Sequence, residues 1–312
     1  MNDQKMIKKI FSLSRYDFIN NFTNWISITG FHAVILSIIF CFLCYATQDY
    51  NISYWGWAPN IVLDLISKFY FLINSSSLVT IIVGALTISF ILLTPLIIIQ
   101  NSLDLAFDSS MQGLFIRNTH IGSYFAVIIL SNILLLLFMK LLSYFTIFAM
   151  LYFMQTSYIL NIFFIRFFVL ATTFIIIYFK QMIYFLAMHV LEYKKDILLS
   201  CKEIYQMVSG KFLFLSKILL VQMLIVACAL IALYVSLETF VSVIVPFILW
   251  FFDLFQLSVV ATFVYMLYNF FYVWAYLLLY VWICLVIAHV YRQLACPPVG
   301  TMSCPTCKSC DK

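Results

Sequence analysis

Long apolar segments separated by short polar stretches occupy the chain between residues 26 and 291. A helix needs about twenty apolar residues to cross roughly 30 Å of hydrocarbon. Six segments meet this requirement, so the pattern predicts an all-α polytopic integral membrane protein with six transmembrane helices. The predicted spans are 26–46, 78–99, 123–145, 162–183, 212–235 and 270–291.

Two segments complicate this count. The apolar region 123–153 is longer than one span requires, so its helix either tilts or ends near Lys140 and continues along the interface. The stretch 238–268 is hydrophobic enough for a seventh span, but it contains Glu238 and Asp253. We expect it to be re-entrant or interfacial, with a backbone that is helical or buried in protein.

The basic residues favour six crossings over seven. With a cytoplasmic N-terminus, six crossings leave twelve Lys and Arg side chains on the cytoplasmic side and only Lys68 in the outer loops. Such an asymmetry is typical of membrane proteins, whose cytoplasmic loops are enriched in Lys and Arg. A seventh crossing would move Arg292, Lys308 and Lys312 outside. We therefore predict a multi-pass protein of the cell (inner or plasma) membrane with cytoplasmic N- and C-termini.

The composition agrees with a membrane protein. The mean hydropathy is +1.09 and 9% of residues are charged, against about a quarter in soluble domains. The first apolar run is too long for the core of a signal peptide, so we expect it to be retained. The predicted organisation is a cytoplasmic amphipathic segment 1–24, a single transmembrane domain 25–291 and a cytoplasmic cysteine-rich tail 292–312.

Two short segments have the helical period of an amphipathic helix lying on a membrane surface. The first covers residues 5–19, and the second follows the fourth span and can end at Gly210. The apolar positions are Met6, Ile7, Ile10, Phe11 and Phe18 in the first, and Tyr193, Ile197, Cys201, Ile204 and Val208 in the second. The opposite faces carry Lys8, Lys9, Arg15 and Asp17 in the first, and Lys194, Lys195, Lys202, Glu203 and Gln206 in the second.

The basic faces of these helices predict a bilayer with anionic head groups as a partner, because nearby Lys and Arg are attracted to an acidic leaflet. The residues expected to contact head groups are Lys8, Lys9, Arg15, Lys194, Lys195, Lys202 and Lys211. Each amphipathic helix leads into a span, an outer segment and another span, over 5–99 and 192–291. This order raises the hypothesis of a parallel internal repeat about an axis along the membrane normal.

Three stretches of sequence carry a resemblance to a known family. They are the run Met182-Ile-Tyr-Phe-Leu-Ala-Met-His-Val-Leu-Glu192, then Leu199-Ser200 with Val208-Ser-Gly-Lys-Phe212, and the terminal Ala288-His-Val-Tyr-Arg-Gln-Leu294. Together they resemble the membrane domain associated with glycerophosphodiester phosphodiesterases and its bacterial membrane-protein relatives. The resemblance covers most of residues 5–294 and implies a six-helix membrane domain without a known active site. The phosphodiesterase barrel is absent here, and no functional residue carries over.

The tail concentrates cysteine. Cys296, Cys304, Cys307 and Cys310 are four of the nine cysteines in the chain. Two Cys-x-x-Cys steps with Cys296 as fourth ligand could hold one tetrahedral zinc ion. Iron–sulfur ligation, thiol–disulfide exchange and acylation of a cysteine near the membrane are alternatives. A disordered cytoplasmic tail with reduced thiols explains the same residues.

Charged residues in the outer half of the predicted domain form a second candidate site. Lys140, Arg166, Glu238 and Asp253 could pair within a vestibule lined by protein, where a substrate would bind. Structural ion pairs and snorkelling of the long side chains explain the same residues. Lys180 and Lys217 lie near the cytoplasmic ends of their spans and are expected to snorkel.

No motif indicates an enzyme. The sequence contains neither a His-Glu-x-x-His pattern nor a Gly-x-Ser-x-Gly elbow nor a Walker loop, and we expect His32, His189 and His289 to be structural. Two functions remain. One is a permease-like or envelope-associated membrane protein without catalytic activity, and the other is a membrane scaffold or assembly factor that recruits a cytoplasmic protein through the cysteine tail.

Overall fold

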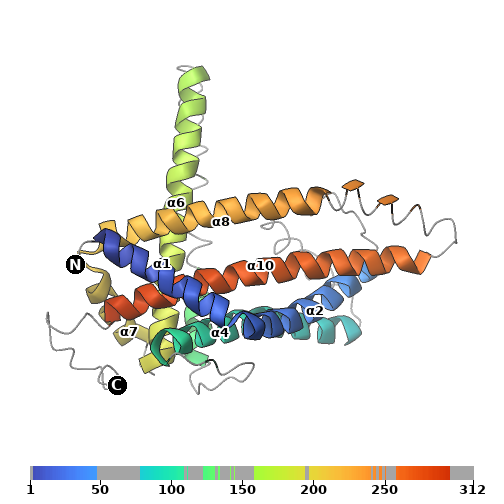
Figure 1. The fold of residues 1–312 in the computed structure, drawn as a ribbon, viewed down its shortest axis with the longest axis horizontal. Coiled ribbons are helices and arrows are strands. Elements are labelled where there is room, and N and C mark those ends of the chain that lie inside the picture. The colour runs from blue at the N-terminus through green and yellow to red at the C-terminus, as the bar shows by residue number, and fades with distance from the viewer. Residues whose placement is uncertain are drawn as a thin grey trace.

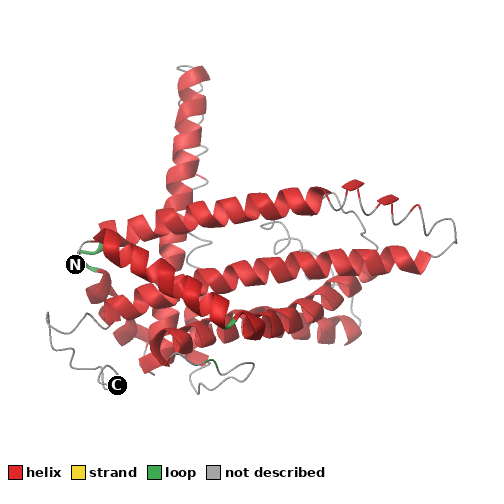
Figure 2. Cartoon of the chain, in the orientation of Figure 1, coloured by secondary structure: helices red, strands yellow, loops and turns green. Residues whose placement is uncertain are grey.

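The computed structural model describes the chain in six continuous stretches together with a few isolated positions. The stretches are 3–47, 78–108, 122–130, 158–193, 197–239 and 258–295. Figure 2 shows that regular structure within them is helical, with short loops and no strand among the described residues. The prediction of an all-α chain is confirmed for this part of the protein.

The helices follow the predicted order along the chain. They are α1 (Asp3–Asn20), α2 (Phe22–Thr47), α4 (Leu78–Asp108), α6 (Tyr158–Tyr193), α7 (Ile197–Val208), α8 (Phe212–Thr239) and α10 (Ser258–Ala295). Five predicted spans lie inside α2, α4, α6, α8 and α10. The remaining span, 123–145, is helical over 122–130, and most of its other residues lie outside the described part.

Three of the described helices contain a segment that is long and apolar enough to cross a membrane. The segments are Ala171–Tyr193, Phe212–Ser236 and Phe270–Ala295. Apolar helices of this length are compatible with a membrane protein.

The observed helices are longer than the predicted spans. α6 has 36 residues and α10 has 38, so at 1.5 Å per residue they measure about 54 and 57 Å, well beyond roughly 30 Å of hydrocarbon. α10 also begins at Ser258 instead of residue 270, so the predicted interfacial segment 238–268 shares its last part with this helix. The reason is that residues 258–269 contain neither Gly nor Pro to interrupt the helix.

α10 is the central helix of the fold. It contacts α1, α2, α4, α6, α7 and α8. Figure 1 shows α8 along one side of α10 and α2 with α4 along the other, while α6 runs across this direction and projects past α8. The C-terminal half of α10 supplies much of the core, including Val281, Leu285 and Val290, each with 0% of its surface exposed.

The outer surface of the long helices is apolar. α8 exposes Leu213, Leu224 and Ile231 by 73%, 67% and 63%. Polar side chains lie inside instead, among them Thr29 and His32 of α2, with 0% and 2% exposed. Water disfavours large apolar surfaces of this kind, whereas lipid does not. This arrangement of apolar outside and polar inside fits a bilayer as the surrounding solvent.

Candidate functional site

A group of charged and polar side chains gathers where α1, α7 and the C-terminal ends of α4, α6 and α10 meet. We call it the polar layer, and it consists of Asp17, His189, Glu203, His289, Tyr291 and Arg292 together with the carbonyl of Ala106. The helix ends that form it lie toward the side of Figure 1 where the N-terminus is marked. His189, Arg292 and the carbonyl of Ala106 lie past the predicted spans, because α4, α6 and α10 extend beyond them, whereas His289 and Tyr291 lie at the end of the predicted span 270–291.

His189 of α6 lies at the centre of a three-residue chain. Its Nε2 is 2.6 Å from Oε2 of Glu203 on α7, and its Nδ1 is 2.7 Å from the hydroxyl of Tyr291 on α10. The imidazole is buried, Tyr291 is fully enclosed, and the Glu203 side chain is 28% exposed. This series of hydrogen bonds from Glu203 through His189 to Tyr291 therefore leads from the edge of α7 into the core and joins three helices.

Both protonation states of His189 preserve these contacts. A carboxylate can only accept, so Nε2–H donates to Glu203 in either state. In the neutral ring, the Tyr291 hydroxyl donates to Nδ1, whereas in the imidazolium Nδ1–H donates to the hydroxyl oxygen. Both ring nitrogens of His189 thus have protein partners, which leaves neither of them available to a substrate in this conformation.

A second carboxylate–histidine pair fixes α1. Nε2 of His289 on α10 donates to Oδ2 of Asp17 at 2.7 Å, and the two side chains are only 4% and 15% exposed. The pair joins residues 272 positions apart in the chain. Asp17 had been expected on the polar outer face of α1, and this is wrong. The predicted apolar positions of that helix do share one face, but the face packs on the protein core, where Ile10 is fully buried and Met6, Ile7, Phe11 and Phe18 lie against it.

Arg292 of α10 caps the C-terminal end of α4. Its guanidinium donates to the carbonyl of Ala106, and its carbon Cζ lies 5.9 Å from the centre of the Phe107 ring. Ala106 belongs to the last turn of α4, whose carbonyls have no partner within the helix. A cation at this end also interacts favourably with the helix dipole. Arg292 therefore holds the C-terminus of α4 against α10.

The predicted second amphipathic helix is present with a shifted face. α7 ends at Val208, and Gly210 follows with a φ of 78°, a left-handed conformation that favours glycine. Ser200 and Ile204 are buried. Cys201 was predicted to lie on the apolar face with Ile204, but it is exposed. Glu203 turns inward because His189 binds it.

The predicted cations on the two amphipathic helices lie at the surface where they are described. The exposed ones are Lys8, Lys9, Arg15, Lys202 and Lys211, while Lys194 and Lys195 lie outside the described residues. Lys180 is also exposed, and Nζ of Lys217 is 3.4 Å from Oδ2 of Asp3 with both side chains about half exposed. That Lys180 and Lys217 snorkel to the cytoplasmic face stays a prediction.

The other predicted sites are not described in the structure. Lys140 and Asp253 lie outside the described residues, and for Arg166 of α6 and Glu238 of α8 only the helical backbone is described. The tail with Cys296, Cys304, Cys307 and Cys310 is likewise outside. Within the described stretches, no three His, Cys, Asp or Glu side chains are placed to share a metal ion.

Several buried polar atoms have no hydrogen-bond partner within the described residues. Both amide atoms of Gln181 on α6 and the hydroxyl of Ser37 on α2 are of this kind, and these side chains are 2% and 1% exposed. Leaving a buried donor or acceptor unpaired costs about 1–3 kcal/mol.

Sequence reasoning found the histidines but not their partners. His189 and His289 stand out as single polar residues on apolar helices, and both were expected to be structural. Asp17, Glu203 and Tyr291 were not recognised as their partners, because each follows the pattern of its own helix. A usable signal was present: buried histidines at one predicted end of the bundle need partners, and both amphipathic helices supply a carboxylate there.

Comparison of the chain with models of protein families, with curated proteins and with solved structures finds no match. The resemblance to the membrane domain associated with glycerophosphodiester phosphodiesterases therefore stays a prediction.

Proposed function

We propose that this chain is a six-span, permease-like or envelope-associated protein of the cell membrane without catalytic activity of its own. The observation that carries the proposal is the distribution of polar side chains. Thr29, His32 and Gln222 are buried between helices whose outer surfaces are apolar. Polar residues within membrane helices generally face the protein interior, where they serve a substrate path or a helix contact.

The polar layer supports an even number of crossings. On the six-span topology, α1, α7 and the C-terminal ends of α4, α6 and α10 all belong to the cytoplasmic side. Hydrogen bonds of the polar layer join these same segments. Two segments that are joined by hydrogen bonds must lie on the same side of the bilayer. This requires an even number of spans between them, because an odd number would place them on opposite sides.

α6 needs a change of orientation in this proposal. Figure 1 shows it across α8 and α10, whereas three helices that cross one bilayer run closer to parallel. The C-terminal end of α6 is fixed in the polar layer through His189. We expect α6 to turn about this end in the membrane, so that its exposed Phe167, Ile175 and Phe179 face lipid.

The unpaired atoms of Gln181 and Ser37 support a permease-like interior. A small polar solute that passes between the helices would satisfy them, because each offers hydrogen bonds that the protein does not use. The predicted outer vestibule with Lys140, Arg166 and Asp253 would be the other end of such a path.

Two further parts belong to the proposal. The partner at the cytoplasmic face is the anionic head-group region, reached by the exposed cations of α1 and α7. The other is a parallel internal repeat over 5–99 and 192–291, which superposition of the two units would test.

Charge displacement on solid-supported membranes tests the transport function. Proteoliposomes with the full chain receive concentration jumps of amino acids, organic anions and inorganic cations. We expect a current for one of these classes that Gln181→Leu abolishes and Asp253→Asn weakens. Leu224→Ala, on the lipid-facing side of α8, is the control and should leave the current unchanged. No current with any class would favour the scaffold.

The scaffold rests on the four cysteines of the tail. It predicts that deletion of 296–312 releases a protein that co-purifies with the full chain, and that the full chain contains zinc by elemental analysis. A permease-like protein keeps its currents after this deletion.

A further inference from the structure

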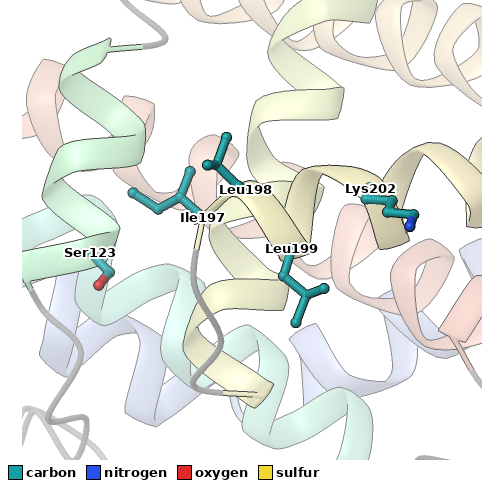
Figure 3. A pocket seen from close by; sticks show the side chains of 5 residues that line it. All are labelled: Ser123, Ile197, Leu198, Leu199 and Lys202. Atoms are coloured by element: carbon teal, nitrogen blue, oxygen red, sulfur yellow. The ribbon is translucent and has the colours of Figure 1, made fainter.

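An open groove lies beside α7. It has a volume of about 670 Å³ and is lined by Ile197, Leu198, Leu199 and Lys202 of α7 and by Ser123 of the helical segment 122–130. Figure 3 shows the three aliphatic side chains between Ser123 on one side and Lys202 on the other. None of these residues belongs to the polar layer.

The lining combines an aliphatic surface with a cation and a hydroxyl. Leu198 is 86% exposed and Leu199 is 48% exposed, although water disfavours such side chains at the surface. Lys202 is exposed next to them. A ligand that covers this surface therefore needs a hydrocarbon part and an anionic part, close to each other.

Among the described residues, the lining of the groove carries the cation Lys202, and the next residue, Glu203, is engaged elsewhere. Glu203 follows Lys202 in sequence, but its Oε2 accepts from Nε2 of His189 at 2.6 Å on the inner side of α7. The same bond fixes α7 on α6, so the lining residues of α7 occupy defined positions. The groove thus presents a fixed amphipathic surface with a cation that can bind an anion.

We propose that this groove is a binding site for an anionic phospholipid. Its phosphate binds the Lys202 ammonium, and the first part of its acyl chains covers Ile197, Leu198 and Leu199 in the direction of Ser123. The volume favours a lipid over free phosphate, since sites of about 300–1,000 Å³ hold molecules far larger than one phosphate. This proposal rests on the proposed placement of α7 at the membrane. It goes beyond the general attraction between basic helices and an acidic leaflet, because it names a specific binding site for one lipid molecule.

Lipid retention by the full chain tests the site. The protein, purified in detergent, is titrated with phosphatidylglycerol and, separately, phosphatidylcholine, and bound lipid is counted by native mass spectrometry. We expect Lys202→Gln to weaken phosphatidylglycerol binding about fivefold and Leu198→Gln to weaken it as well. Lys211→Gln removes an exposed cation outside the groove and is the matched control. Unchanged thermal unfolding of Lys202→Gln excludes a folding defect.

Three results would overturn the proposal. Equal losses in Lys202→Gln and Lys211→Gln would mean diffuse attraction without a site. Equal retention of phosphatidylcholine would remove the role of the anion. Displacement of the lipid by glycerol phosphate would assign the groove to a soluble phosphate compound.

The membrane placement is tested separately. Labelling of Cys201 on α7 by a membrane-impermeant maleimide reports the side on which this helix lies. Labelling only from the cytoplasmic side with no preference for phosphatidylglycerol would overturn the groove alone. Labelling from outside would overturn the proposed topology, whatever the lipid measurement gives.

Discussion

The two amphipathic helices are fixed by the same chemistry in different settings. α7 lies between α6 and α8 in the chain, and Glu203 meets His189 only 14 positions away. α1 is followed directly by α2, and Asp17 meets His289 at a separation of 272 positions. His189 has Tyr291 as an additional partner. α7 therefore has several restraints, whereas α1 depends more heavily on one carboxylate–histidine pair and on its apolar face.

This difference separates two roles for a buried carboxylate–histidine pair. On α7, chain connectivity already places the helix, and the hydrogen bonds select its rotation by turning Glu203 inward. On α1, the pair joins the helix to α10, 272 positions further along the chain. Removing one carboxylate should therefore have unequal consequences in the two helices.

Asp17→Ala should have the greatest effect. It leaves His289 buried without its acceptor, and a hydrogen bond to a charged group contributes about 1.5–3 kcal/mol. We expect a loss of about 2–3 kcal/mol in the free energy of unfolding in detergent and faster tryptic cleavage after Lys8 and Lys9. Asp3→Ala, on the same helix but half exposed, serves as the control and should change little. Equal effects of the two substitutions would contradict the account.

Glu203→Ala should cost less, about 1–2 kcal/mol, because His189 keeps Tyr291 and α7 keeps both chain connections. Hydrogen exchange should become faster in α7 and remain unchanged in α1. Gln206→Ala, on the exposed side of α7, is the control. Faster exchange in α1 would show that the two pairs are not independent.

Tyr291→Phe removes one hydroxyl and should cost about 1 kcal/mol. A double-mutant cycle in thermal unfolding measures its coupling to each carboxylate. We expect non-additivity with Glu203→Ala, because both residues bind the same imidazole. Additivity is expected with Asp17→Ala, and the reverse pattern would refute the three-residue chain.

Lys217→Gln should have the smallest effect of the four. Its pair with Asp3 has exposed partners at 3.4 Å, and such pairs are weak and screened by salt. We expect no measurable change in thermal unfolding at high salt. A loss comparable to that of Asp17→Ala would mean that this exposed pair, and not Asp17, holds α1.

The sequence predicts the helices well because hydrophobic length and period are local properties. The segments 26–46, 78–99, 162–183, 212–235 and 270–291 all lie in observed helices. The helix ends were placed less well. α6 continues to Tyr193 and α10 to Ala295, since a helix persists without a breaking residue after its apolar character ends. These extensions contain His189 and Arg292, which belong to the polar layer.

The partners in the polar layer depend on tertiary contact, which helical period does not contain. Asp17 and Glu203 both occupy polar positions of an amphipathic pattern, and the pattern assigns such residues to the outer face. Packing of α1 on α10 and of α7 on α6 turned them inward. Only the three-dimensional arrangement reveals which polar residue of an amphipathic helix meets a buried histidine.

The most direct test of the account is the side on which the two amphipathic helices lie. Two single-cysteine variants in a cysteine-free background are needed, one retaining Cys201 on α7 and one with Ser12→Cys on the exposed side of α1. Labelling by a membrane-impermeant maleimide is compared between intact cells and inside-out vesicles. The account predicts that both positions react only in inside-out vesicles. Reaction of either position in intact cells would contradict it.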